Sequence, residues 1–413
     1  MSGRARAPRG TFDVLPDDAA RRERLESAAR ETLGAAGYRR IETPTFEATE
    51  LFARGVGEAT DIVRKEMFTF DYGSDSTVTL RPEGTAPICR AYLEHGMAKL
   101  PRPVRLWYLG AFYRRERPQA GRYRQFWQVG AEAIGSDDPA LDAEVIVLLA
   151  DVLDAVGVRG VRLRIGSLGT PQNRAAYRDE LQDYLRAHAG ELSEDVRERI
   201  DLNPMRAFDA DHPGTRRVMA GAPRLLDRLP AEDLDHFAAV RAHLDDAGLH
   251  HEVDATLVRG LDYYTRTLFE FSSDRLGAQS GVGGGGRYDG LVELLGGPAT
   301  PGVGWAAGVE RMLLASEGLP DATPVVDLYV APAKPEARRT AFHLAREARR
   351  AGLAAQLEAA GRSVKGQLKH ADRIGARYVA IVGDEVTLRD MQSGEQRDVA
   401  PERALHDVLK PLA

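Results

Sequence analysis

Two strand-like segments on either side of an arginine-rich loop constrain the fold of this chain more than any other feature. Residues 104–114 and 126–134 have the composition of β-strands. The polar segment 115–125 between them contains Pro118 and Gly121, which interrupt regular structure. The spacing predicts an antiparallel strand–loop–strand hairpin, and therefore a domain with an antiparallel sheet.

Length and composition bound the remaining possibilities. A chain of 413 residues is too long for one hydrophobic core, so two or three domains are expected. The net charge of -6 argues against indiscriminate binding to polyanions, although local patches govern contact with nucleic acid. One cysteine, Cys89, rules out an internal disulfide and a thiolate zinc cluster. Without an apolar run of about 18 residues, no transmembrane helix is expected, and the predicted location is cytoplasmic.

Several elements flank the predicted hairpin. Residues 17–34 have apolar side chains at helical spacing, and residues 41–44 are expected to form a short strand that ends at a proline. After the hairpin, residues 142–156 are predicted to be helical and residues 161–165 to form a strand. These elements are expected to surround the antiparallel sheet.

The central part of the chain has a different character. Thr170 followed by Pro171 predicts the start of a helix, because threonine caps helices and proline is favoured at their first position. Charged helical segments then dominate, which predicts a helical insertion over about 171–251. Strand character resumes at 257 and is expected to continue through 271.

A second domain is predicted beyond a linker at residues 318–324, so the expected domains are 1–324 and 325–413. Strand-like and helical segments alternate in the second domain, which favours a small α/β domain with parallel strands. The strands are expected at 327–331, 354–357 and 378–382, and the helices at 335–352 and 363–375.

The hairpin loop and its flanks carry an unusual concentration of arginine. Residues 102–124 contain seven arginines, a single acidic residue, Glu116, and several interleaved aromatic side chains. Guanidinium groups bind phosphate oxygens bidentately, and aromatic rings stack on bases. ATP and tRNA are both candidate ligands, and a solvated charged face is the alternative interpretation.

Glycine-rich residues 281–286 match the dinucleotide-binding pattern only formally. That pattern requires a preceding buried strand and a following helix, and neither is predicted here. No Gly-Lys-Ser/Thr sequence occurs in the chain, so a P-loop is excluded.

Two further segments, Arg259-Gly-Leu-Asp-Tyr-Tyr-Thr265 and Gly284-Gly-Gly-Arg-Tyr-Asp-Gly290, combine arginine, aspartate, tyrosine and glycine in a way that a packed core does not require. Together they resemble the two histidine-binding signatures of the histidyl-tRNA synthetase family. The resemblance covers almost the whole chain. Residues 17–44, 112–126 and 302–311 are similar to the three class II synthetase signatures, 203–206 to a run in the bacterial insertion, and 325–413 to the anticodon-binding domain.

The resemblance implies a fold and an activity. The fold is an α+β catalytic domain with an antiparallel sheet of the class II synthetase type, a helical insertion and a C-terminal α/β anticodon-binding domain. The activity is that of a histidine–tRNA ligase, which converts L-histidine and ATP to histidyl-adenylate and pyrophosphate and then transfers histidine to the 3′ end of tRNA(His). Mg²⁺ is expected to enter with ATP and not to be held by protein alone, and a homodimer is implied.

The same resemblance assigns residues to ATP. Arg114 would contact the α-phosphate and, with Arg259, act in catalysis. Glu116 would accept a hydrogen bond from the adenine amine, and Arg122 would hold the outer phosphates. Two further residues would contact the adenine, namely Phe126 and Arg311. In the hairpin loop, the residues placed to meet the tRNA acceptor end are Arg117 and Gln119.

The amino-acid site needs acids for the ammonium group, a cation for the carboxylate and a sieve for the side chain. The resemblance gives the ammonium to Glu83 and Thr85, and the substrate backbone to Gln128. It gives the carboxylate to Arg259. The two imidazole nitrogens, one a donor and one an acceptor, would face Glu132 and Tyr264, and the pocket walls would be Tyr263 and Tyr288.

Other functions remain open for a chain of this kind. One paralogue of the family is a non-catalytic regulatory subunit in histidine biosynthesis that lacks the C-terminal domain. The presence of Arg114, Arg259, Arg311 and residues 325–413 argues against it. A sensor of uncharged tRNA usually carries a kinase, which this chain lacks, and a threonyl enzyme would need a zinc-binding set that the lone Cys89 does not supply.

Overall fold

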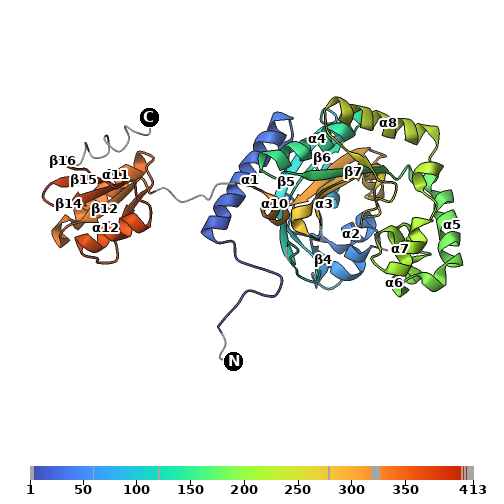
Figure 1. Ribbon diagram of the computed structural model, residues 1–413, viewed down its shortest axis with the longest axis horizontal. Coiled ribbons are helices and arrows are strands. Elements are labelled where there is room, and N and C mark those ends of the chain that lie inside the picture. Colours follow the sequence, from blue (N-terminus) through green and yellow to red (C-terminus); the bar gives the residue numbers. More distant parts are fainter. Residues whose placement is uncertain are drawn as a thin grey trace. The chain divides into compact units, whose positions relative to one another are not determined.

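The computed structural model describes residues 4–58, 60–119, 121–277, 280–317 and 326–400, together with Arg403 and His406. Internal contacts divide the chain into two compact units, Met1–Pro320 and Asp321–Ala413 (Figure 1). Each unit has its own sheet and its own hydrophobic core. The linker expected at 318–324 lies outside the described residues.

An eight-stranded sheet forms the first unit, and it is antiparallel throughout its centre. Parallel pairs occur only where a two-residue strand joins each edge. In spatial order the strands are β1 (Arg39–Arg40), β5 (Val104–Tyr113), β6 (Gln125–Ile134), β11 (Gly302–Gly308), β10 (Gly281–Arg287), β9 (Thr265–Ser273), β7 (Val161–Ser167) and β8 (Glu252–Val253). The predicted hairpin is confirmed, with Val104 paired to Ile134 and Tyr113 to Gln125.

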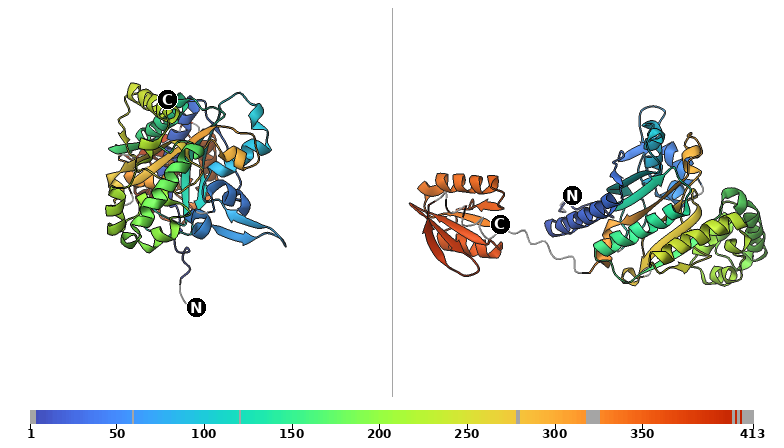
Figure 2. Two further views of the ribbon diagram at one scale, coloured as in Figure 1. Left: turned by 90° about the vertical axis from the view of Figure 1, so that its right-hand side faces the viewer. Right: turned by 90° about the horizontal axis from the view of Figure 1, so that it is seen from above.

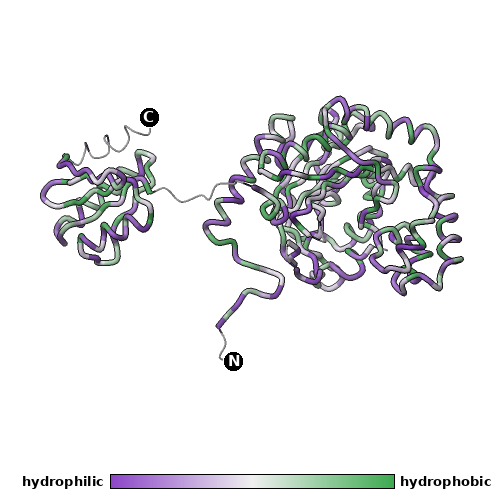
Figure 3. Tube along the Cα trace, viewed as in Figure 1, coloured by the Kyte–Doolittle hydropathy of each residue, from purple (hydrophilic) through white to green (hydrophobic). Residues whose placement is uncertain are grey.

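Two hydrophobic cores lie against this sheet. The first core joins strand residues such as Phe269 and Trp305 to buried side chains of four helices. Those helices are α1 (Pro16–Ala35), α4 (Pro139–Ala155), α8 (Ala231–Asp246) and α10 (Val309–Ala315). Figure 2 shows the helices and the sheet from two further directions, and Figure 3 shows the hydrophobic stretches of the strands.

The second core includes side chains of the insertion and of helices next to a small three-stranded sheet. The small sheet consists of β2 (Phe46–Ala48), β4 (Thr77–Leu80) and β3 (Phe68–Asp71). Three helices join it: α2 (Thr49–Val56), α3 (Thr85–Glu94) and α9 (Leu291–Leu294), and a π-helical segment, Ile62–Glu66, follows α2. The tyrosines of both predicted histidine-binding segments belong to this core.

The insertion is helical, as predicted. Helix α5 (Pro171–Ala187) begins as expected, since the Thr170 hydroxyl accepts a hydrogen bond of 3.2 Å from the Asn173 amide and Pro171 is the first helical residue. Short helices follow, and α8 returns the chain to the sheet (Figure 1). The short elements are α6 (Glu194–Arg199), the 3-10 helix Pro204–Asp209, and α7 (Pro213–Ala220).

Two strand predictions in the first unit are wrong. Residues 41–44 are not a strand, because their carbonyls leave the sheet edge and the Arg81 guanidinium donates to the Thr43 carbonyl at 2.7 Å. The strand expected over 257–271 begins only at Thr265. The first half of that segment is a loop, in which Asp262 accepts from the Asn203 side chain and the Tyr264 carbonyl accepts from Arg174.

Residues 281–286 form most of the central strand β10, so the rejected dinucleotide loop is absent from this segment. The glycines allow the neighbouring strands to approach closely. A Cβ atom on Gly285 would lie 1.9 Å from the Gly304 carbonyl oxygen, far inside van der Waals contact. The glycine run is therefore a packing requirement of the sheet.

The second unit is an α/β domain with a mixed sheet. Strands β13 (Ala355–Leu357), β12 (Leu328–Pro332) and β14 (Tyr378–Val382) are parallel, and the helices are α11 (Arg338–Arg350) and α12 (Val364–Arg373). The three predicted strands are parallel, as expected, and two strands that were not predicted, β15 (Val386–Asp390) and β16 (Gln396–Val399), extend the sheet antiparallel. Their tight turns allow antiparallel pairing without a crossover helix.

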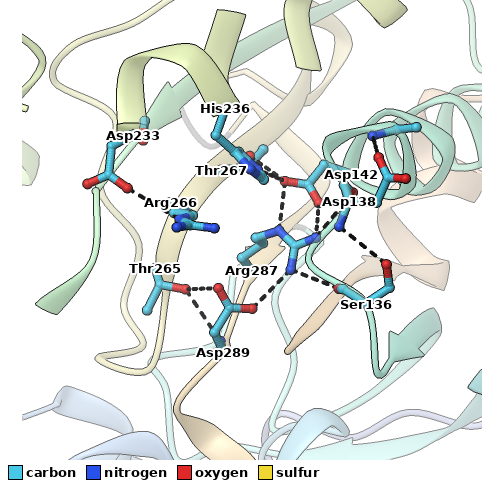
Figure 4. A network of polar contacts seen from close by, with 12 residues as sticks. Ser136, Asp138, Asp142, Asp233, His236, Thr265, Arg266, Thr267, Arg287 and Asp289 are labelled. Carbon is cyan, nitrogen blue, oxygen red and sulfur yellow. Dashed lines mark hydrogen bonds and ion pairs between the residues drawn. The ribbon is translucent and has the colours of Figure 1, made fainter. Parts of the chain in front are cut away.

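A buried ion pair ties the first unit together (Figure 4). The side chains of Arg287 on β10 and Asp142 on α4 are fully buried, with Arg287 Nη2 2.7 Å from Asp142 Oδ1. Asp142 also accepts from the Thr267 hydroxyl at 2.5 Å, and His236 Nε2 of α8 lies 2.9 Å away. One carboxylate therefore joins two helices to two strands.

Removing this carboxylate should destabilise the first unit strongly. Asp142→Asn removes the fully buried counter-charge of Arg287 and leaves it only the partly exposed Asp289, 3.0 Å from its Nη1. We expect the free energy of unfolding to fall by about 3 kcal/mol. Chemical denaturation measures the change. Glu180→Gln, which removes an exposed ion pair with Arg228, is the control and should have a much smaller effect. Equal effects of the two substitutions would contradict this account.

Candidate active site

A cavity of about 390 Å³ opens beside β6, β10 and β11 in the first unit. Five arginines and three glutamates line it, together with aromatic side chains and glycine backbone. The cavity brings together seven residues predicted from the sequence: Arg114, Glu116, Arg122, Phe126, Gln128, Arg259 and Arg311. This density of guanidinium groups suits a polyanionic ligand.

The hairpin positions Arg114, Glu116 and Arg122 as one group. Arg114 Nε donates to the Pro82 carbonyl at 2.9 Å, and its guanidinium lies 5.3 Å from the centre of the Phe126 ring. Glu116 lies between the two arginines, 3.6 Å from Arg114 and 3.3 Å from Arg122. The single acid of the loop therefore holds two cations at the cavity wall.

Arg259 reaches the cavity from the loop before β9. Its Nη1 donates to Glu270 Oε2 at 2.6 Å, and Arg164 donates to the other oxygen of Glu270 at 2.7 Å. A Cβ atom on Gly284 would lie 3.2 Å from Arg259 Nη1 and 2.5 Å from the Phe269 carbonyl. The glycine of one signature thus makes room for the arginine of the other.

Arg311 lies in the first turn of α10, where the helix dipole disfavours a cation. Its Nε donates to the Gly281 carbonyl. Burial lowers the pKa of the Arg311 guanidinium, and the charge of Arg122 lowers it further. Two cations that face one cavity are stabilised by an anion between them.

A buried cluster of carboxylates, hydroxyls and phenols adjoins this strand face. Glu132 accepts from the Thr85 hydroxyl at 2.8 Å and from the Tyr288 hydroxyl at 2.7 Å. Glu83 accepts from the backbone amide of Thr85 at 2.8 Å and from the Tyr263 hydroxyl at 3.3 Å. The fold therefore assembles four separate segments around two carboxylates.

The tyrosine rings pack against one another in this cluster. The ring centre of Tyr263 lies 4.8 Å from that of Tyr264 and 6.1 Å from that of Tyr288, both in edge-on arrangements. All the predicted histidine-binding residues other than Arg259 and Gln128 belong to the cluster and lie outside the lining of the cavity. They are Glu83, Thr85, Glu132, Tyr263, Tyr264 and Tyr288.

Gln128 links the cavity to the buried cluster. It lines the cavity and lies four residues before Glu132 on β6, so both side chains project from the same face of the strand. The Oε1 atom of Gln128 is buried without a hydrogen-bond partner. A buried acceptor of this kind is costly unless a donor reaches it.

Burial raises the pKa of the Glu132 carboxyl to about 8, from an ordinary value of 4.5. The hydroxyls of Tyr288 and Thr85 oppose the rise, and the charge of Glu83 adds to it. A Cβ atom on Gly304 would lie 1.8 Å from Glu132 Oε2, so β11 must carry glycine at this point. The site thus confines a carboxyl group that has hydrogen-bond donors around it.

The loop residues predicted to meet tRNA are exposed. Arg117 and Gln119 lie between β5 and β6, outside the lining of the cavity. The backbone of Gln119 pairs with that of Arg122 in both directions, at 3.1 and 2.9 Å. The loop therefore has a defined backbone while these side chains face solvent.

Three cavity residues were missed in the sequence: Arg164, Glu270 and Glu310. Glu270 stands between phenylalanines in an apolar strand, and that misplaced charge is a signal of function. Glu310 accepts from the Trp127 amide at 3.0 Å and from Arg22 at 2.5 Å. No local pattern marks this contact, since it joins residues almost 290 positions apart.

An antiparallel sheet that carries an arginine-lined cavity, followed by a separate α/β unit, fits the fold of a class II aminoacyl-tRNA synthetase. Residues 10–312 match the family model described as histidyl-tRNA synthetase, and residues 327–410 match the anticodon binding domain. The chain belongs to the histidyl-tRNA synthetase family.

Individual relatives agree with this assignment. The chain is 46% identical to a histidine–tRNA ligase from Desulforamulus reducens, covering 95% of this chain and 96% of the relative. It is 48% identical to one from Streptomyces avermitilis, with the same coverage. The crystal structure of apo S. aureus histidyl-tRNA synthetase is similar, with a TM-score of 0.82 at 35% identity over 98% of this chain and 99% of that one.

One other finding bears on the setting of the protein. In the part of the chain that the structure describes, no helix combines the length and the apolar character needed to cross a membrane.

Glu132 should make stability depend on pH. In the folded protein the Glu132 carboxyl keeps its proton up to about pH 8, whereas in the unfolded chain the same carboxyl releases it near pH 4.5. The folded state therefore binds more protons in that interval, and this carboxyl lowers stability as the pH rises through it.

Glu132→Gln should remove this dependence. Thermal midpoints measured across the interval should fall less steeply with rising pH for the variant than for the unsubstituted protein. Parallel curves would show that Glu132 titrates normally in the folded protein.

Proposed function

We propose that this chain activates L-histidine with ATP and transfers it to the 3′ end of tRNA(His), using the cavity for ATP and the adjoining buried cluster for histidine. The observation that carries the proposal is their adjacency. An arginine-lined cavity opens beside the strand face that carries Gln128 and the buried carboxyl of Glu132. A polyanionic ligand in the cavity and an amino acid with a small polar side chain in the cluster can therefore bind next to each other.

ATP occupies the cavity in this proposal. Arg114, fixed on the Pro82 carbonyl, contacts the α-phosphate, and Arg122 holds the outer phosphates. Phe126 stacks under the adenine, whose amine donates to Glu116. Arg311 covers the other face of the ring.

Histidine occupies the neighbouring site. Glu83 and Thr85 hold the ammonium group, the unpaired acceptor of Gln128 receives a substrate donor, and Arg259 pairs with the carboxylate. The imidazole nitrogens face Glu132 and Tyr264, because one nitrogen donates and the other accepts. The remaining walls are Tyr263 and Tyr288.

The reaction has two steps. A carboxylate oxygen of histidine attacks the α-phosphorus of ATP, the bond to the β-phosphate oxygen breaks, and pyrophosphate leaves. A ribose hydroxyl of the terminal tRNA nucleotide then attacks the histidyl carbonyl, and AMP leaves. Arg114 and Arg259 contribute mainly by orientation and by stabilising the charge that develops on the α-phosphate.

Mg²⁺ accompanies ATP in this proposal and screens phosphate charge. The carboxylates that line the cavity are already engaged by arginines or by a backbone amide. No group of three or more potential metal ligands occurs among the described residues. Phosphate oxygens would therefore be the chief ligands of the ion.

The proposal divides the chain into two domains. Residues 1–324 form the catalytic domain and residues 325–413 the anticodon-binding domain. Arg117 and Gln119 meet the tRNA acceptor end from the exposed loop. The protein works as a homodimer in the cytoplasm.

Histidine-dependent exchange of pyrophosphate into ATP tests the proposal. Arg259→His should lower exchange by about two to three orders of magnitude, because one charge-stabilising group is lost from the transition state. ATP binding should persist, since Arg114, Arg122 and Arg311 remain. Arg162→His is the matched control, because Arg162 pairs with Asp274 at the surface of the neighbouring strand β7.

Near-normal exchange by folded Arg259→His would defeat the catalytic assignment. Absence of histidine-dependent exchange from the unsubstituted protein, with or without tRNA, would favour a regulatory or sensor function instead.

A further inference from the structure

The insertion contacts the first histidine-binding segment at three separate places. The side chain of Asn203 donates to Asp262 Oδ1 at 2.8 Å, and Arg174 of α5 donates to the Tyr264 carbonyl at 3.0 Å. Arg266, just after the segment, forms an ion pair of 3.3 Å with Asp233 of α8. The sequence between Arg259 and Arg266 is thus held from outside the sheet.

The backbone at Arg266 needs such support. Among the described residues it is the only non-glycine residue with a positive φ, 41°. A non-glycine residue in this region is strained, and the conformation persists only where its surroundings fix it. The Arg266 amide donates to the Gly169 carbonyl at 2.9 Å, and its carbonyl accepts from the Leu168 amide at 2.8 Å.

This conformation lies where the two signatures meet. The pairing of β10 with β9 shifts register between Gly286 and Arg287, since Gly286 pairs with Leu268 while Arg287 pairs with Thr265. Arg266 lies inside that irregularity. It directly follows Thr265, whose hydroxyl donates to Asp289 at 3.4 Å (Figure 4).

The partner of Arg266 is built into the insertion. The Asp233 side chain is fully buried, and its other oxygen accepts from the Asn173 side chain at 2.8 Å and the Thr170 amide at 3.3 Å. One carboxylate therefore joins the start of α5, the start of α8 and the left-handed residue. Figure 4 shows Asp233 and Arg266 beside the buried Arg287–Asp142 pair.

Asp262 is surrounded by the insertion on its charged side. Burial raises the pKa of the Asp262 carboxyl, and the opposing influences come from Arg206, Arg174 and Arg178 and from the Asn203 amide. All four residues belong to the insertion. A Cβ atom on Gly57 would lie 2.6 Å from Asp262 Oδ2, so the opposite side of the carboxylate has no space for movement.

We propose that Asn203, Arg174 and Asp233 are positioning residues through which the helical insertion holds Arg259 and Tyr264 in place for histidine. The inference rests on the proposed function and deepens it. The insertion contacts the signature directly, whereas Arg114 is held by the Pro82 carbonyl and by Glu116 of its own hairpin. Loosening it should therefore weaken use of histidine while use of ATP is preserved.

The kinetic test compares three variants in pyrophosphate exchange. Asn203→Ala and Arg174→Met should each raise KM for histidine by about tenfold, the range expected for one hydrogen bond to a buried or charged acceptor. Asn203→Asp, which places like charge against Asp262, should raise it further. KM for ATP should stay within about twofold of normal.

Arg228→Met is the matched control. Arg228 also anchors α5, through Glu180, but it has no contact with the signature. Its KM for histidine should be unchanged. Histidine KM values near normal in all three test variants, or a parallel rise in KM for ATP, would overturn the inference.

Hydrogen exchange separates this inference from the proposed function. Without substrates, the amides of residues 259–266 should exchange faster in Arg174→Met than in Arg228→Met. Equal protection would overturn the positioning role whatever the enzyme catalyses. If the unsubstituted protein shows no histidine-dependent pyrophosphate exchange, the proposed function fails. The protection of these amides from hydrogen exchange still decides whether the insertion holds this segment.

Discussion

The confinement of the Glu132 carboxyl is the constraint on which the site depends. It is fully buried, accepts hydrogen bonds from Thr85 and Tyr288, and has its pKa raised to about 8 by that burial. Burying an ionisable group costs free energy unless polar partners surround it. The two hydroxyl donors provide some of these polar partners, and in the proposed function the imidazole of the substrate provides a further one.

Neighbouring features of the fold follow from this requirement. Strand β11 carries glycine at 304 because any side chain there would occupy the space of the carboxylate. Strand β10 carries glycine at 284, beside the Arg259 guanidinium. The Arg287–Asp142 pair anchors the strand end that presents Tyr288, and the insertion holds the segment that presents Tyr264. Side chains of low exposure thus fix the groups that meet substrate in the proposed function.

Local patterns in the sequence predict the hairpin with its arginine-rich loop, helix α1 and the helical insertion, whereas Arg259 and Arg311 were assigned by the family resemblance. Each of these local patterns depends on residues close together in the chain, such as the loop breakers between β5 and β6 or the cap at Thr170. The two antiparallel strands after β14 and the loop before Thr265 were not predicted, because tertiary contacts decide them. Glu270 and Glu310 were missed for the same reason, since Arg164, Arg259 and Arg22 reach them from distant segments.

The most direct measurement of the central claim compares histidine with β-thienylalanine in pyrophosphate exchange. The thienyl ring is similar in size to imidazole but has no nitrogen, so Glu132 and Tyr264 lose the hydrogen bonds that the imidazole would make. We expect exchange with the analogue to be about four orders of magnitude lower in kcat/KM, because a site built for hydrogen bonds rejects an apolar analogue strongly. Exchange within about tenfold of that with histidine would show that the buried carboxyl and phenol do not read the imidazole.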